Sequence, residues 1–130
     1  MQIFVVHGGL PEQEGVTLDD IMEIDRFKEC VPEGELMEYL LWSDPMPEKG
    51  IKENSRGCAC MFGPDVAERW LELNKLTTIV RSHECMERGY KEMFGGKLVT
   101  VFSASNYCGV VSVASLLVLR VSDVVLLFFH

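Results

Sequence analysis

The chain has 130 residues, 48% of them hydrophobic, which is enough for one domain with a buried core. Its formal net charge of −8 argues against binding nucleic acid through the phosphates, because that mode needs clustered lysine and arginine. The acidity is typical of an ordinary solvated surface, but an acidic protein can still act on phosphoryl groups when metal ions supply positive charge.

The first half of the chain predicts one strand and two helices. Residues 2–6 form a short apolar run with β-branched side chains, which predicts a buried strand ended by Gly8-Gly9. Thr17, with an acid three residues later, has the pattern of a helix start. Residues 35–41 predict a second short helix. The next segment predicts a functional loop of about fifteen residues. The turn-forming residues of this segment are Pro45, Pro47, Gly50, Asn54 and Gly57.

The second half predicts a helix followed by strands. Gly63-Pro64-Asp65 opens the clearest helix, with proline at the first helical position and an acid beside it. Its core side is expected to carry Val66, Trp70, Leu71 and Leu73. Residues 77–80 predict a strand that leads into Arg81-Ser82-His83, and residues 97–102 predict another that delivers a loop at 103–108. This order of elements indicates an α/β protein with a β-rich terminal part.

The tail after residue 109 is the most apolar stretch of the chain. Its longest charge-free run stops at Arg120, and Asp123 follows, so the run is too short and too charged for a membrane span. It predicts instead two strands joined near Val121-Ser122-Asp123. We therefore expect no membrane partner.

The cysteines and the first residues bear on the cellular compartment. No basic and then apolar leader opens the sequence, so we expect reduced thiols and a cytoplasmic protein, with the nucleus also open. The thiols are expected to be buried and structural rather than to bind zinc. They belong to Cys30, Cys58, Cys60, Cys85 and Cys108.

Two histidines stand where α/β proteins place ligand sites. His7 and His83 each follow a predicted strand and precede turn residues, and the sites of open α/β proteins lie beyond strand ends. Neutral imidazole is a good ligand for divalent metals. Taken singly, each histidine is better explained as a capped or hydrogen-bonded structural residue. Together with the motifs below, the two histidines favour a metal site.

Six short motifs in order resemble the phosphoprotein phosphatases, which are metal-dependent Ser/Thr protein phosphatases, and the resemblance is closest to the type 5 branch. The likeness covers residues 4–108 almost continuously. The motifs are His7-Gly8-Gly9-Leu10, Gly15-Val16-Thr17-Leu18-Asp19-Asp20-Ile21, Leu40-Leu41-Trp42-Ser43-Asp44-Pro45, Phe62-Gly63-Pro64-Asp65-Val66, Arg81-Ser82-His83-Glu84 and Thr100-Val101-Phe102-Ser103-Ala104.

The resemblance implies a calcineurin-like metallophosphoesterase fold, a β-sandwich with flanking helices, and two divalent metal ions, either manganese or iron paired with zinc or manganese. It implies that His7 and His83 bind the same ion and that Arg56 holds the substrate phosphate. The substrates would be phosphoserine and phosphothreonine in proteins, attacked by metal-activated water.

The same likeness assigns roles around the cleft. Tyr107 would line it as a catalytic and substrate-binding residue, with Cys108 beside it. Trp42 and Asp44 would belong to a loop that walls the site, and they would bind the substrate together with Cys108.

Each of these residues has an alternative explanation without function. Arg56 could be a solvated charge, Tyr107 a half-buried aromatic, and Trp42 a core anchor. Asp44 before a proline could be only a turn residue, and Cys108 an ordinary thiol.

The departures from the family pattern concern both ends of the chain. The family's upstream Asp- and His-bearing motifs do not precede His7, so we expect a C-terminal portion of the catalytic domain with its N-terminal half missing. Ser105 replaces a usual proline, and the likeness decays after Cys108. We expect residues 1–108 to be family-like and residues 109–130 to form a divergent β-rich tail.

Three explanations remain open at this point: a segment of an active phosphatase, a non-catalytic binding or regulatory homologue, and an incomplete gene product. The isolated chain is expected to be inactive and to associate through an exposed apolar face, with residues 116–129 contributing most.

Overall fold

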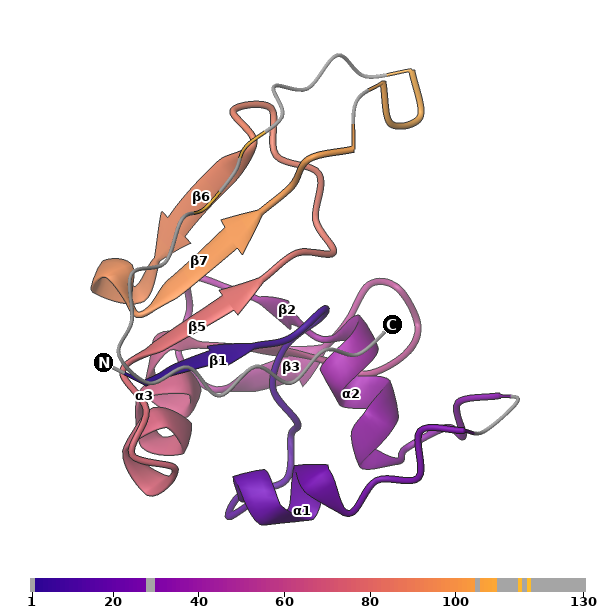
Figure 1. The fold of residues 1–130 in the computed structure, drawn as a ribbon, viewed down its shortest axis with the longest axis vertical. Coiled ribbons are helices and arrows are strands. Elements are labelled where there is room, and N and C mark those ends of the chain that lie inside the picture. The colour runs from indigo at the N-terminus through magenta and orange to yellow at the C-terminus, as the bar shows by residue number, and fades with distance from the viewer. Residues whose placement is uncertain (1, 28–29, 105, 110–114, 116, 118–130) are drawn as a thin grey trace.

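A computed structural model describes residues 2–27, 30–104, 106–109, 115 and 117. Its larger sheet contains β1 (Ile3–Val5), β5 (Thr78–Arg81), β7 (Leu98–Val101) and β6 (Tyr90–Met93), in the order β1-β5-β7-β6. The first three strands run parallel, and β6 is antiparallel to β7. Figure 1 shows these strands side by side, with α1, α2 and α3 gathered toward the β1 side. The strands predicted at residues 2–6, 77–80 and 97–102 are therefore confirmed.

A smaller sheet occupies the segment for which the sequence predicted only a loop. It consists of β2 (Asp44–Pro45), β4 (Cys60–Phe62) and β3 (Ile51–Glu53), in the order β2-β4-β3. The loop prediction was wrong. The strands were missed because each is only two or three residues long. Runs that short carry no alternating pattern, and the prolines and glycines between them signal only turns.

The helices begin where the sequence indicates. α1 (Leu18–Met22) starts with a capping box in which Thr17 and Asp20 bond each other's backbone N–H groups. α2 (Leu36–Trp42) follows, and α3 (Pro64–Leu73) has proline in its first turn and is followed by the C-cap residue Asn74. A short 3-10 helix, η1 (Phe94–Gly96), precedes β7. Leu73 was wrongly assigned to the core: its side chain is 48% exposed.

One apolar core joins the two sheets to α3. Phe62 of β4 belongs to the same buried cluster as Phe4, Ile79 and Leu98 of the larger sheet. The ring of Trp70 on α3 packs on that of Phe4, with centroids 4.7 Å apart. The shared core holds β1 and β5 in fixed relation to the smaller sheet. The candidate site is carried by the ends of β1 and β5, by β2, and by the loop between β3 and β4. The α/β fold class and the two-sheet arrangement are thus confirmed.

Two further features of the structure differ from the sequence predictions. β6 was not predicted, because its sequence Tyr-Lys-Glu-Met is mostly polar and it lies exposed at a sheet edge. The thiols were expected to be buried, but only Cys60 is, while Cys30, Cys85 and Cys108 are exposed.

The predicted strand pair in the tail lies outside the described residues. Within the described ranges, no helix is long and apolar enough to cross a membrane.

Candidate metal and phosphate site

The two histidines meet at the carboxyl ends of neighbouring parallel strands. The strand ends are tied by hydrogen bonds from the Val6 N–H to the Val80 carbonyl (3.0 Å) and from the Ser82 N–H to the His7 carbonyl (3.1 Å). As a result Nε2 of His7 lies 3.1 Å from Nδ1 of His83, although the two residues are far apart in sequence. The parallel pairing of β1 and β5 is therefore what creates the imidazole pair.

Two glycines allow the His7 turn to press against α2. A Cβ atom at Gly8 would lie 2.4 Å from the carbonyl carbon of Leu41, and one at Gly9 would lie 2.3 Å from the Phe62 ring. Side chains do not tolerate such approaches, so glycine is required by space at both positions. The Gly8 N–H also donates to the Leu40 carbonyl at 2.8 Å. The turn thereby fixes His7 beside the end of α2.

Burial keeps both imidazoles neutral at pH 7. Burial, followed by the charge of Arg56, lowers the pKa of His83 to about 4. Burial and then Arg81 lower the pKa of His7 below its ordinary value. The Trp42 ring stands edge-on to His83, with centroids 5.3 Å apart, and contributes to that environment. His83 also adopts a left-handed φ of 69°, a strained conformation for a non-glycine residue that is often found at functional sites.

Arg81 is a buried hub beneath the histidines, only 2% exposed. Its Nε donates to the Gly8 carbonyl at 2.6 Å, and its terminal nitrogens bond Asp44 at 2.9 Å, Ser43 O at 3.4 Å and the Glu84 carboxylate. Burial lowers the pKa of Arg81, against the opposing effect of the Glu84 and Asp44 charges. Sequence reasoning named Arg81 only as part of a motif. The sequence signal that could have singled out Arg81 is its position directly after a predicted apolar strand and two residues before His83.

Arg56 is anchored rather than free in solvent. Its Nε donates to Oδ2 of Asp44 at 2.6 Å, while Asn54 donates to the same oxygen at 3.0 Å and to the Trp42 carbonyl at 3.2 Å. Asn54 Oδ1 in turn accepts the backbone N–H of Arg56 at 3.0 Å. Among the described residues, Nε is the only guanidinium nitrogen of Arg56 with a hydrogen bond. The terminal nitrogens are thus left to meet a ligand.

The charge of Asp44 is stabilised by its partners. Burial alone would raise the pKa of Asp44, but hydrogen bonds from Arg56 and Asn54 and the charge of Arg81 outweigh it, so the pKa is lowered. Asp44 is only 5% exposed and is bonded by these side chains, so the alternative that it is only a turn residue is wrong.

One open cavity of about 360 Å³ collects most of the predicted site residues. Trp42 is 41% exposed, so the alternative that it is a core anchor is wrong. Tyr107 is 51% exposed, and its ring stands edge-on to Phe102 at 5.3 Å. Asp44 lies beneath the cavity and reaches it through Arg56, and the exposed Cys108 does not line it. The lining residues are His7, Leu41, Trp42, Arg56, His83 and Tyr107.

The imidazole pair fits two ligands of a single metal ion. Metal–imidazole bonds are about 2.0–2.1 Å long, so two such nitrogens on one ion lie roughly 3 Å apart, and the observed 3.1 Å agrees. Both rings are neutral, as ligation requires. Nε2 of His83 is buried without a hydrogen-bond partner in the described part of the chain. No group of three or more His, Cys, Asp or Glu side chains that could hold an ion occurs among the described residues. The described residues thus offer two ligands, and fewer than a complete set.

The parallel strand ends, the imidazole pair and the anchored arginine all lie within one segment of the chain that matches a known family. The sequence profile of the calcineurin-like phosphoesterases matches residues 2–87, and the chain belongs to this family. The family implies divalent metal ions.

Within the family, the chain is similar to type 5 Ser/Thr protein phosphatases. Serine/threonine-protein phosphatase 5 of Rattus norvegicus is 49% identical over 107 residues, which cover 82% of this chain and 21% of that protein. The Arabidopsis thaliana protein of the same name is 53% identical over 82% of this chain and 20% of its own length.

A solved structure agrees with these relatives. The Saccharomyces cerevisiae Ser/Thr phosphatase with similarity to human phosphatase PP5 matches with a TM-score of 0.73 and 47% identity, over 81% of this chain and 33% of that one. The predicted resemblance and the partial domain are confirmed. The chain spans about a fifth of the length of the curated relatives it matches.

Proposed function

We propose that this chain forms one side of the active site of a protein phosphatase that hydrolyses phosphoserine and phosphothreonine. The observation that supports it best is the single cavity in which two neutral imidazoles, 3.1 Å apart, face an anchored guanidinium. In this role His7 and His83 would hold one divalent ion. Arg56 would bind the phosphate through its terminal nitrogens, as a planar guanidinium does well.

The residues of the chain would position the substrate. Asp44 holds the Arg56 guanidinium through Nε, and Asn54 holds the Asp44 carboxylate and the Arg56 backbone N–H in place, so that little side-chain entropy is lost when a phosphate binds. Trp42 and Tyr107 wall the cavity and would limit the access of water to the ester. The metal ions, manganese or iron with zinc or manganese, would supply Lewis-acid stabilisation and an activated water when bound.

We also propose that the isolated chain is inactive, because its described residues supply two imidazoles and no accompanying carboxylate for an ion. The test is hydrolysis of p-nitrophenyl phosphate with added manganese, and the expected rate is no higher than in buffer. Turnover that disappears in a His83→Ala variant would overturn this expectation. Turnover that survives in that variant points to a contaminating enzyme and leaves the chain itself inactive.

A non-catalytic binding protein is the second candidate, favoured by the combination of an intact phosphate-side wall with an incomplete metal set. This function would be supported if a phosphoserine peptide binds the chain without being hydrolysed and if Arg56→Ala abolishes the binding.

We further propose that residues 1–108 are the family-like part and residues 109–130 a divergent tail, in a cytoplasmic or nuclear protein. Association through an exposed apolar face stays a prediction, since residues 118–129 lie outside the described part.

A further inference from the structure

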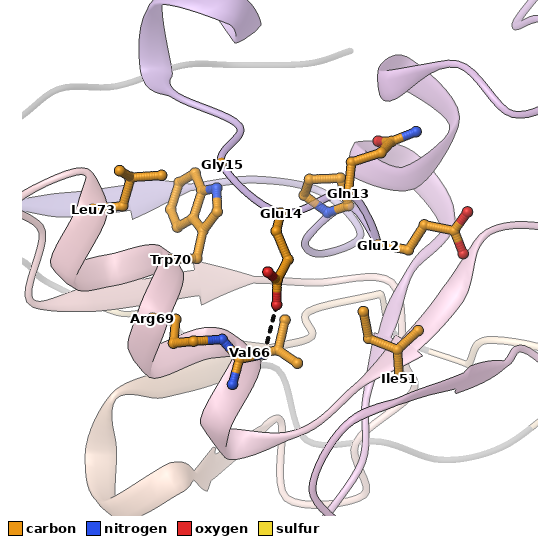
Figure 2. Close-up of a pocket in the computed structure, with 10 residues that line it drawn as sticks. Glu12, Gln13, Glu14, Gly15, Ile51, Val66, Arg69, Trp70 and Leu73 are labelled. Carbon is orange, nitrogen blue, oxygen red and sulfur yellow. Dashed lines mark ion pairs between the residues drawn. The ribbon is translucent and has the colours of Figure 1, made fainter.

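A second cavity, of about 210 Å³, lies between α3 and the loop that follows Gly9, and it shares no residue with the metal and phosphate site. Its floor is apolar: Trp70 and Leu73 of α3 face Ile51 of β3. In Figure 2 these side chains surround the opening, and Glu14 reaches across it toward Arg69. We call this feature the α3 groove.

The α3 groove exposes apolar surface that the fold itself does not cover. Leu73 is 48% exposed and Ile51 is 38% exposed, although both are aliphatic and stand beside an apolar cavity. Single exposed aliphatic residues are common, but two of them that line one concave surface form a pocket that can bind an apolar side chain.

One of the lining side chains, Trp70, carries a buried hydrogen-bond donor without an acceptor in the described part of the chain. Trp70 is only 5% exposed, and its indole Nε1–H has no hydrogen-bond partner in the described part of the chain. In Figure 2 the nitrogen edge of the indole is turned toward Gly15, which also lines the cavity. Buried tryptophan N–H groups usually find an acceptor. A peptide carbonyl entering the groove beside Gly15 would provide one after a small shift of that loop.

The rim of the groove carries net negative charge. Glu12 and Glu14 line it on the loop side, and Arg69 is the cation among its lining residues. The Glu12 carboxylate accepts a hydrogen bond from the neutral Tyr39 hydroxyl at 2.7 Å and keeps its charge. The Arg69 guanidinium is already shared between Asp65 at 3.0 Å and Glu14 at 3.4 Å. A cationic side chain would therefore gain more from this rim than an anionic one.

We propose that the α3 groove is a docking site for a basic peptide segment of a partner protein, in which a leucine-type side chain fills the cavity and a flanking lysine or arginine meets Glu12 and Glu14. Backbone carbonyls of the segment would accept from Trp70. The combination of an apolar anchor, charges beside it and a main-chain acceptor is typical of short peptide recognition. The proposal does not depend on the proposed phosphatase function.

The test uses the whole chain and a fluorescein-labelled peptide with a central Lys-Leu-Lys, measured by fluorescence anisotropy. Replacing the peptide leucine by serine should weaken binding about tenfold or more. Replacing both lysines by glutamate should weaken it about threefold or more. Equal binding of the leucine and serine peptides, or no binding of the Lys-Leu-Lys peptide, would overturn the proposal.

Variants of the protein locate the contact. Leu73→Ser and Ile51→Ser should each weaken binding at least threefold, while Phe27→Ser, at a position 98% exposed and outside the groove, should leave it unchanged. Because Leu73 and Ile51 are partly exposed, these changes should spare the fold, which a thermal melt checks. Glu14→Lys should remove the preference for lysine over glutamate in the peptide.

The indole resonance of Trp70 in a ¹H–¹⁵N spectrum gives a readout that needs no variant. It should shift on saturation with the Lys-Leu-Lys peptide, while that of Trp42 stays in place. An unmoved Trp70 signal at saturation would place the peptide elsewhere and contradict the proposal. Dimerisation of the chain could also contradict the proposal. If the dimer forms with rising concentration, is abolished by Leu73→Ser and is not displaced by the peptide, a second copy of the chain fills the groove.

Discussion

Arg81 connects the His7 turn to Asp44 of β2, which in turn bonds Arg56, and its removal should be more costly than that of any surface arginine. Arg81→Met would leave Asp44 and the Gly8 carbonyl without their buried partner. Losing one member of a buried ion pair costs about 3–5 kcal/mol in unfolding free energy. Urea denaturation of wild type and variant measures this loss.

The matched control is Arg69→Met, because Arg69 is exposed and ion-paired to Asp65 on the same helix. Such surface pairs contribute less than about 1 kcal/mol. If both substitutions lowered the unfolding free energy by the same amount, Arg81 would not be the hub that its contacts indicate.

His83 should make the stability of the chain depend on pH on the acidic side. Its pKa is about 4 in the folded state and near the ordinary histidine value of about 6.5 in the unfolded state. The unfolded chain therefore binds more protons in this window, so stability is complete above about pH 6.5 and falls as the pH drops toward 4.

The measurement is the urea midpoint against pH for wild type and His83→Asn. Asparagine tolerates the left-handed φ of 69° and does not titrate, so the variant should lose less stability between pH 6.5 and 4. Parallel curves for the two proteins would show that His83 is not held neutral by the fold.

At the scale of elements, the contact between the His7 turn and α2 leaves no room for a side chain. Gly8→Ala would bring a methyl group to 2.4 Å from the carbonyl carbon of Leu41, which is backbone and cannot rotate away. We expect a loss of about 3 kcal/mol in unfolding free energy, at the upper end of the usual cost of overpacking.

A second glycine separates crowding from backbone strain. Gly34 has a φ of 75° and open space around it, so Gly34→Ala should cost only about 1 kcal/mol. A Gly8→Ala variant as stable as wild type would mean that the turn and α2 can move apart, and that His7 is not fixed by their contact.

The elements also show what sequence patterns can and cannot reveal. The capping box at Thr17 and the proline at the start of α3 are local signals, and both mark the observed helix starts. β6 and the strands of the smaller sheet escaped prediction because edge position and pairing define them, and neither leaves a hydrophobic period in so few residues. Helix starts could be predicted from the side chains beside them, whereas the pairing of strands that are distant in the sequence could not.

At the scale of the whole molecule, the same distinction applies to the site. His7 and His83 could be placed at strand ends from the sequence, but their 3.1 Å separation depends on the parallel pairing of β1 and β5. The position of Arg81 at a strand end could mark it as a residue of interest, but its contacts could not be predicted, because its partners Gly8 and Asp44 lie 73 and 37 residues away in the chain. Cys108 was expected beside Tyr107 in the cavity, yet only Tyr107 lines it.

We propose that the fold brings His7 and His83 together as two ligands of one divalent ion beside Arg56. The most direct measurement is an NMR titration of the whole chain with substoichiometric Mn²⁺, which broadens the signals of nuclei near the bound ion. We expect the ring signals of His7 and His83 and the Arg56 side-chain signal to broaden first, and this selectivity to vanish in His83→Asn. If His7 and His83 kept sharp lines while surface acids such as Glu33 and Glu38 broadened, the imidazole pair would not be a metal site.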